Sequence, residues 1–174
     1  MKCLVVIDVQ NDFVTGSLGT AEAVEMLPRL LEKMRSFEGA ILMTIDTHEE
    51  NYLDTQEGRM LPVKHCIMGT EGWRFPEEVN ALRESRGARI YAKPTFGSEK
   101  LVADLKRLYE SDELESVELV GLCTDICVIS NAMVLRAAFP ETEIEILSDC
   151  CAGVTPQSHQ TALDAMRACQ FTIV

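Results

Sequence analysis

Gly121-Leu122-Cys123-Thr124-Asp125-Ile126-Cys127-Val128 follows a short apolar run at 117–120 and precedes an amphipathic segment at 129–138. This order predicts a buried strand, a tight turn and a helix. Cys127 would lie where the helix begins, and the helix dipole and free backbone N–H groups there favour a thiolate. The sequence therefore predicts a nucleophilic cysteine at this turn.

The same alternation of strands and helices continues along the chain. Strands that alternate with helices pair in parallel through right-handed crossovers. The sequence therefore predicts one α/β domain over residues 1–174, with three α/β/α layers around a six-stranded, mainly parallel, Rossmann-like sheet. We expect strands at 3–7, 40–45, 89–92, 117–120, 143–147 and 171–174, and helices at 21–37, 76–85, 99–109, 126–138 and 156–169.

Composition excludes several classes of protein. The 174 residues are 47% hydrophobic, which is enough for a sizeable core, and the net charge of −12 argues against nucleic acid or an anionic membrane as partner. No segment resembles a signal peptide or a membrane span, so a cytoplasmic location is expected. The seven cysteines include no C-x-x-C pair, which indicates reduced, mostly buried thiols rather than a redox pair or a zinc ribbon.

Reactive side chains follow the expected strands. Asp8 follows the first strand, Lys93 the third, Cys127 the fourth and Asp149 the fifth. The carboxyl ends of parallel strands meet at one edge of a sheet, where ligands bind. A carboxylate there accepts a thiol proton, and an ammonium group lowers the thiol pKa. Each residue alone has an ordinary interpretation, as a turn cap, a surface lysine or a packed cysteine, but together they favour a nucleophile with its base.

A second cluster has the composition of a metal site. In Asp46-Thr47-His48 the first and third side chains point the same way if the segment is extended, and His65 lies in the long polar segment 47–75. One aspartate and two histidines suit zinc, iron or manganese. The alternative is a hydrogen-bonded loop pair. Cys66 is expected to be buried rather than a ligand, and His159 to lie on a helix surface.

These residues match a known family. Val6-Ile7-Asp8-Val9-Gln10-Asn11-Asp12-Phe13, with Gly16-Ser17-Leu18 after it, resembles the opening of nicotinamidases in the isochorismatase-like cysteine hydrolase superfamily. The segments around Asp46, His65, Lys93 and Cys127 fall in the order and spacing of that family. The resemblance extends over essentially the whole chain.

The resemblance implies a role for each matching residue. Asp8 resembles the general base, Lys93 its charged partner and Cys127 the nucleophile. Backbone N–H groups of Cys123 and Cys127 would form an oxyanion hole, after a non-proline cis peptide between Leu122 and Cys123. The implied metal ligands are Asp46, His48 and His65, with Glu57 as a further acidic ligand or, alternatively, a solvated loop carboxylate.

The expected pocket departs from the family pattern. Many nicotinamidases carry an aromatic residue before the proline of the His65 segment, where this chain has Leu61, and one extra residue separates Pro62 from His65. We expect this aromatic wall to be absent or to be supplied by Phe13, Phe96 or Trp73. The expected pocket residues are Phe13, Leu18, Leu61, Phe96 and Leu122.

The resemblance implies a metal-dependent cysteine amidohydrolase. The first choice is a nicotinamidase of NAD metabolism, which converts nicotinamide and water to nicotinic acid and ammonia through a thioester, with zinc as the divalent metal and iron or manganese as alternatives. A cysteine hydrolase of the same superfamily that acts on a carbamoyl or ureido amide is the alternative. An isochorismate vinyl-ether hydrolase and a non-catalytic metal-binding protein are more remote. The implied partners are a small-molecule amide and further copies of the chain.

Overall fold

A computed structural model describes all residues from 1 to 174. Six strands form one sheet in the order β3-β2-β1-β4-β5-β6, and every neighbouring pair is parallel. The sheet is therefore wholly parallel, where the sequence predicted a mainly parallel one. The strands are β1 (Lys2–Ile7), β2 (Ala40–Asp46), β3 (Arg89–Lys93), β4 (Ser116–Leu122), β5 (Glu143–Ala152) and β6 (Thr172–Ile173).

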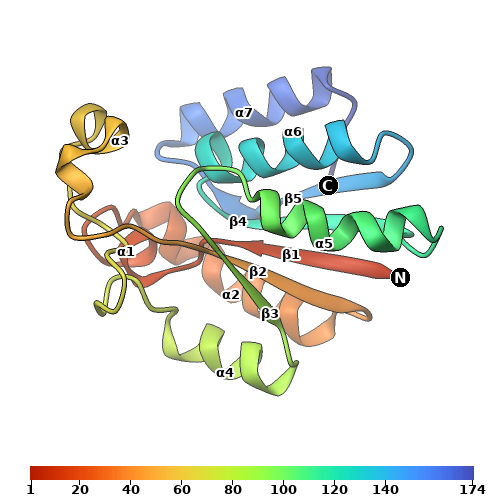
Figure 1. Ribbon diagram of the computed structural model, residues 1–174, viewed down its shortest axis with the longest axis horizontal. Coiled ribbons are helices and arrows are strands. Elements are labelled where there is room, and N and C mark those ends of the chain that lie inside the picture. The colour runs from red at the N-terminus through yellow and green to blue at the C-terminus, as the bar shows by residue number, and fades with distance from the viewer.

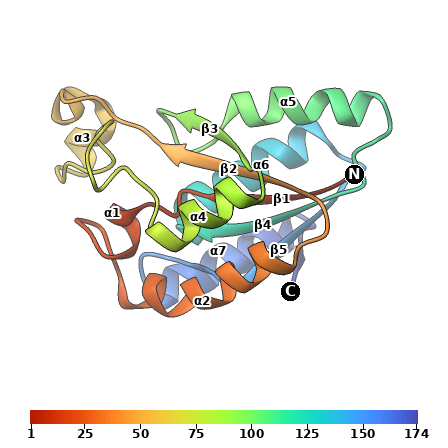
Figure 2. The same ribbon diagram turned by 90° about the horizontal axis from the view of Figure 1, so that it is seen from below.

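Helices cover both faces of the sheet. On one face lie α2 (Ala21–Ser36) and α4 (Glu77–Ser85), and on the other lie α5 (Glu99–Glu110), α6 (Ile129–Ala138) and α7 (Pro156–Ala168) (Figures 1 and 2). This arrangement confirms the predicted three-layer α/β/α fold. None of these helices has both the length and the apolar composition needed to cross a membrane.

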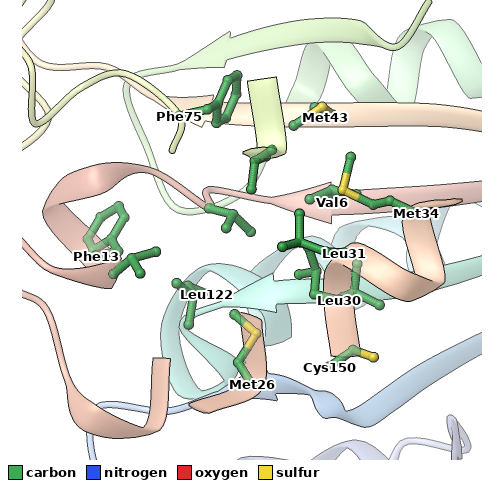
Figure 3. Close-up of a cluster of buried hydrophobic side chains, with 14 of the residues drawn as sticks. Val6, Phe13, Met26, Leu30, Leu31, Met34, Met43, Phe75, Leu122 and Cys150 are labelled. Atoms are coloured by element: carbon green, nitrogen blue, oxygen red, sulfur yellow. The ribbon is translucent and has the colours of Figure 1, made fainter. Parts of the chain in front are cut away.

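The core is divided between the two faces by the alternation of side chains in the strands. In β1, Leu4 and Val6 point to the α2 side, while Val5 and Ile7 point to the α5 and α6 side. On the α2 side, Val6 lies near Leu30, Leu31 and Met34 of the helix, and Met26 of the same cluster lies beside Leu122 (Figure 3). Both faces of β1 are buried, as expected for a central strand of a parallel sheet.

A glycine brings the two central strands close together where they end. Gly121 of β4 has φ of +121°, and a Cβ atom there would lie 2.2 Å from the carbonyl oxygen of Ile7. Only glycine fits this approach. The sheet order reverses between β1 and β4, so the close contact lies at the topological switch point, where open α/β sheets form their ligand crevice.

Short elements beyond the carboxyl ends of the strands were not predicted. They are α1 (Asn11–Val14), the 3₁₀ turn η1 (Tyr52–Asp54), α3 (Gln56–Met60) and the π-helical turn η2 (Thr124–Val128). Helices of three to five residues are too short to show a helical period in the sequence. Figure 1 shows α1 and α3 together at this end of the sheet.

The fifth strand is longer than predicted, which corrects one placement. Asp149 lies inside β5 rather than after it, and its exposed side chain faces Arg29 of α2 at 4.0 Å. Asp149 is therefore not one of the residues that gather at the strand ends.

Candidate active site

Asp8, Lys93 and Cys127 come together in the interior, as the strand ends predict. Lys93 Nζ lies 2.6 Å from Asp8 Oδ2 and 3.5 Å from Cys127 Sγ. Asp8 follows β1, Lys93 ends β3 and Cys127 lies in η2, so three separate segments supply the cluster. All three residues are at most 5% exposed, which makes this a buried arrangement of a carboxylate, an ammonium group and a thiol.

Asp8 is held at both carboxylate oxygens. Thr44 Oγ1 of β2 donates a hydrogen bond to Asp8 Oδ1 at 2.8 Å, and Lys93 occupies the other oxygen. The backbone of Asp8 has φ of +48°, so the chain turns sharply at the end of β1. The carboxylate therefore has one fixed orientation toward the nucleophile turn.

The charges in the cluster depend on one another. Burial raises the pKa of Asp8, and the ammonium group of Lys93 opposes that shift. Burial alone would lower the pKa of Lys93, but the negative groups around it, Asp8 first, raise it above its ordinary value. Lys93 therefore stays protonated, and its positive charge is what permits a buried carboxylate beside it.

The thiol differs from the sequence-based expectation. Burial raises the pKa of Cys127 well above its ordinary value, Asp8 raises it further, and Lys93 opposes both. The expected lowering of the thiol pKa by the helix start and Lys93 is wrong for the resting protein. Burial of the sulfur outweighs both effects, because a thiolate in a desolvated site loses its hydration. A raised pKa favours the neutral thiol form of Cys127 in the resting protein.

The turn that carries Cys127 is anchored to its surroundings. The peptide bond between Leu122 and Cys123 is cis, as the resemblance implied. The Cys123 carbonyl accepts hydrogen bonds from the N–H groups of Ile126 and Val128, both at 3.0 Å. Thr124 Oγ1 lies 2.8 Å from His159 Nδ1 of α7, so His159 braces the turn instead of lying free on a helix surface.

The three predicted metal ligands form a compact group next to this cluster. The ligand atoms of Asp46, His48 and His65 all lie within 4.8 Å of one another, and all three residues are buried. Asp46 Oδ2 is 3.0 Å from His48 Nε2 and 3.6 Å from His65 Nε2. Glu57 Oε1 of α3 lies 3.7 Å and 3.8 Å from the same two nitrogens.

The donor set fits a divalent metal. His48 Nε2 is buried and makes no well-aligned hydrogen bond, although Asp46 Oδ2 lies 3.0 Å away, so this imidazole nitrogen is available to a metal ion. His65 Nδ1 lies 2.9 Å from the Val63 carbonyl, and this contact fixes a ring proton on Nδ1 and turns Nε2 toward Asp46. Burial would raise the pKa of Asp46, but the two imidazoles and Lys93 outweigh it and lower the pKa, so the carboxylate is ionised.

Residues that follow β1 hold the candidate metal ligands in place. Gln10 is fully buried, and its side chain accepts from the Asp46 N–H at 2.7 Å and donates to the Asp46 carbonyl at 2.9 Å. Asp12 Oδ2 accepts from the N–H of Cys66, next to His65, at 2.8 Å. The chain beyond β1 therefore clamps β2 and the 47–75 segment together. Cys66 itself is buried, as expected.

The expected pocket residues divide into two groups. Leu61 and Phe96 are 36% and 44% exposed, whereas Phe13 is buried in the core cluster on the α2 side, with its ring 5.5 Å from the His65 ring. Leu18 packs against the core cluster under α2, and Leu122 is buried in that cluster (Figure 3). Leu122 is therefore a core residue rather than a wall of the pocket, because β4 continues two residues further than predicted. Trp73 is tied by its Nε1 to Thr47 Oγ1 at 2.9 Å.

Three residues that hold parts of the site in position were not predicted from the sequence. Thr44 is the only polar residue before Asp46 in β2, and Gln10 lies in the first motif, so both gave a signal. Asn131 gave none, because an asparagine in an amphipathic helix is ordinary. Its buried side chain donates to the Cys127 carbonyl at 2.7 Å.

Comparison with known proteins assigns the family. Residues 2–174 match the family model of the isochorismatase domain. The chain belongs to the isochorismatase family. A nicotinamidase of Schizosaccharomyces pombe is 24% identical to this isochorismatase-family chain over 211 residues, which cover 98% of the chain and 91% of the relative.

Two further isochorismatase-family comparisons agree. The nicotinamidase/pyrazinamidase of Mycobacterium tuberculosis is 26% identical over 186 residues, covering 100% of this chain and 98% of the relative. The crystal structure of pyrazinamidase from Pyrococcus horikoshii in complex with zinc has a TM-score of 0.79 and 26% identity, and the match covers 99% of this chain and 98% of that one. The fold is thus the isochorismatase-like hydrolase fold.

Proposed function

We propose that this protein is a nicotinamidase, a cysteine amidohydrolase that converts nicotinamide and water to nicotinic acid and ammonia. The observation that carries the proposal is the double contact of Lys93. Its Nζ lies 2.6 Å from Asp8 Oδ2 in the thiol cluster and 3.4 Å from Asp46 Oδ1 in the metal cluster. A nucleophile and a metal site that share one lysine suit a substrate that carries an amide and a ring nitrogen a few ångströms apart.

Asp46, His48 and His65 would hold the metal, and Glu57 would be a fourth ligand. When bound, the metal supplies a positive charge and an open coordination position that orients a ring nitrogen or a water molecule. Zinc is the proposed ion, since two imidazoles and a carboxylate suit it and the Pyrococcus horikoshii pyrazinamidase was solved in complex with zinc. Iron and manganese suit the same donors.

Asp8, Lys93 and Cys127 would perform the acyl transfer. Asp8 removes the proton from the Cys127 thiol as the sulfur attacks the amide carbon, and Lys93 keeps Asp8 ionised until then. The backbone N–H groups of Cys123 and Cys127 stabilise the oxyanion. Asp8 returns the proton to the leaving nitrogen, ammonia departs, and a thioester on Cys127 remains. Asp8 then takes a proton from water, whose oxygen attacks the thioester carbon, and returns that proton to the departing Cys127 sulfur as the acid is released.

Phe13 and Phe96 would provide aromatic contacts for the substrate ring, with Leu61 and Leu18 nearby. The biological setting that follows is the salvage of pyridine nucleotides in the cytoplasm, in a homo-oligomeric enzyme. These assignments rest on the family and on the chemistry of the site.

An ammonia-release assay tests the proposal. Wild-type protein is given nicotinamide, pyrazinamide and a set of carbamoyl and ureido compounds, before and after chelation and after zinc, iron or manganese is restored. Nicotinamide should be the best substrate, and its turnover should fall on chelation and return with a divalent metal. Turnover of a ureido compound alone, unaffected by chelator, would assign the protein to the other branch of the superfamily.

A further inference from the structure

One buried amide side chain connects the nucleophile turn to the loop that follows β3. Asn131, in the first turn of α6, is fully buried. Its Nδ2 donates to the Cys127 carbonyl at 2.7 Å and to the Phe96 carbonyl at 3.0 Å. Its Oδ1 accepts from the backbone N–H of Ser98 at 3.0 Å. Every polar atom of the amide therefore has a partner on one of two segments that border the site.

The loop at 94–98 has a second connection to the nucleophile, through Lys93. Lys93 Nζ donates to the Thr95 carbonyl at 3.0 Å and lies 3.5 Å from Cys127 Sγ. The sulfur of Cys127 is thus linked to the loop through Lys93, and its carbonyl is linked to the same loop through Asn131. Together, Lys93 and Asn131 fix the position of the loop relative to both the side chain and the backbone of Cys127.

The tied loop carries an exposed aromatic ring. The Phe96 carbonyl is held by Asn131, while the side chain is 44% exposed. An exposed ring on a fixed backbone is a preformed surface for a flat ligand, and such a surface keeps the ordering cost of binding low.

We propose that Asn131 is a positioning residue that holds the 94–98 loop, and with it Phe96, at a fixed distance from Cys127 before substrate arrives. The ligand class it serves is a planar aromatic amide whose ring contacts Phe96 while its carbonyl carbon meets the sulfur. This role rests on the proposed amidase function and adds a determinant of substrate affinity to it.

The role predicts a particular kinetic signature. Without its hydrogen bonds the loop adopts the pocket-forming conformation only part of the time, and the apparent affinity falls by that fraction. Two lost hydrogen bonds shift such an equilibrium by roughly 10- to 100-fold. Bound substrate restores the loop. KM should therefore rise by about tenfold or more, while kcat stays within about threefold of wild type.

Two variants separate the loop contacts from the turn contact. Asn131→Ala removes all three hydrogen bonds. Asn131→Ser keeps one, because a serine hydroxyl in a helix bonds the carbonyl four residues earlier, here that of Cys127. The serine is too short to reach Phe96 or Ser98. Asn80→Ala is the matched control, since Asn80 of α4 bonds only Glu84 and Arg83 of its own helix, at 3.2 Å and 2.8 Å.

The experiment measures KM and kcat for nicotinamide together with amide hydrogen exchange at Ser98. Both Asn131 variants should raise KM, spare kcat and speed exchange at Ser98, while Asn80→Ala matches wild type. If Asn131→Ala fails to fold, Asn131→Ser alone decides. Wild-type KM in Asn131→Ser, or a loss of kcat with KM unchanged, overturns the proposal.

Failure of the proposed function would look different. Wild-type protein that releases no ammonia from nicotinamide would reject the nicotinamidase assignment itself. The role of Asn131 in holding the 94–98 loop would then be judged by amide hydrogen exchange alone. Unchanged exchange at Ser98 in Asn131→Ser would overturn that role as well.

Discussion

Thr44 Oγ1 and Asp8 Oδ1 are joined by a 2.8 Å hydrogen bond between two fully buried side chains. The same hydroxyl also accepts the backbone N–H of Asp8 at 3.3 Å. Because Lys93 holds the second carboxylate oxygen, Thr44 determines how the first one is turned. A general base must be fixed in direction as well as charge, since small misplacements lower the rate steeply.

Thr44→Val should therefore lower kcat for nicotinamide by about 10- to 100-fold. Valine keeps the shape of threonine but loses the hydroxyl, and a hydrogen bond to a charged group contributes about 1.5–3 kcal/mol. Thr44→Ser should retain most of the activity. Steady-state kinetics compare the three proteins. Metal content is measured alongside, because Asp46 lies two residues away. Wild-type kcat in Thr44→Val would show that Lys93 alone orients the base.

Two cysteines four residues apart should respond very differently to alanine. Cys127→Ala should abolish ammonia release, because no other group can form the thioester. Cys123→Ala should keep most of it, since only the backbone N–H of Cys123 is used and alanine preserves that group. Loss of an oxyanion donor itself would cost about 10²–10³ in kcat.

The comparison is made with ammonia release at saturating nicotinamide, and thermal unfolding confirms that both variants fold. Equal losses in the two proteins would contradict the assignment of Cys127 as the nucleophile. Cys169, which is exposed on the last turn before β6, supplies a control alanine substitution far from the site.

Much of the fold and of the site follows from where apolar runs stop. Asp8 and Asp46 each come at the end of a run that the parallel sheet buries, and Lys93 ends the half-exposed edge strand β3. In the pairing of β2 with β3, Asp46 lies opposite Lys93. The strand pairing alone therefore brings these two side chains together. The sheet geometry thus converts positions in the sequence into neighbours in space.

What the sequence does not predict depends on packing between segments. Asn131 resembles any helical asparagine until the loop at 94–98 is seen to lie against α6. The family resemblance names Glu57, but the five-residue helix that carries it, capped at its start by the Thr55 side chain, is too short to show periodicity in the sequence. Burial of the sulfur is the main cause of the raised pKa of Cys127, and the polar strand ends that identify the site give no measure of that burial.

The metal cluster can be tested through its ligands. His48→Ala should leave the purified protein with little divalent metal, because the remaining Asp46 and His65 give only two strong donors. Glu57→Gln should bind metal about 10- to 100-fold more weakly while the fold is unchanged, if Glu57 supports the site as proposed. Metal content after dialysis and zinc affinity from competition with a chelating dye measure both effects.

Glu50 supplies the control for this test. It also lies in the segment between β2 and α3, but its carboxylate is exposed and contacts only Lys64, at 3.2 Å. Glu50→Gln should bind metal like wild type. Equal affinity of Glu57→Gln and Glu50→Gln would mean that Glu57 is a solvated loop carboxylate.

The neutral thiol makes a prediction about pH. A raised thiol pKa means that the thiolate fraction is small at neutral pH and increases as the pH rises past the ordinary thiol value of about 8.5. Alkylation of Cys127 by iodoacetamide should therefore still be accelerating above about pH 10. A cysteine in a short unstructured peptide, whose pKa is about 8.5, should have levelled off by then. Peptide mass spectrometry separates Cys127 from the other six cysteines. A plateau at or below pH 7 would instead indicate a thiolate already formed in the resting protein.

If the thiol is neutral, the reaction depends on Asp8 to remove its proton. Asp8→Asn separates this proton removal from the reactivity of the sulfur itself. Asparagine cannot take the proton, so nicotinamide turnover should fall to background at every pH. Alkylation at high pH should persist, because hydroxide replaces the base and the neutral amide removes a negative charge that raises the pKa of Cys127. The alkylation curve should therefore move to lower pH while catalysis is lost. A variant that loses both reactivities together would point to a collapsed site, and one that keeps turnover would show that another group removes the proton.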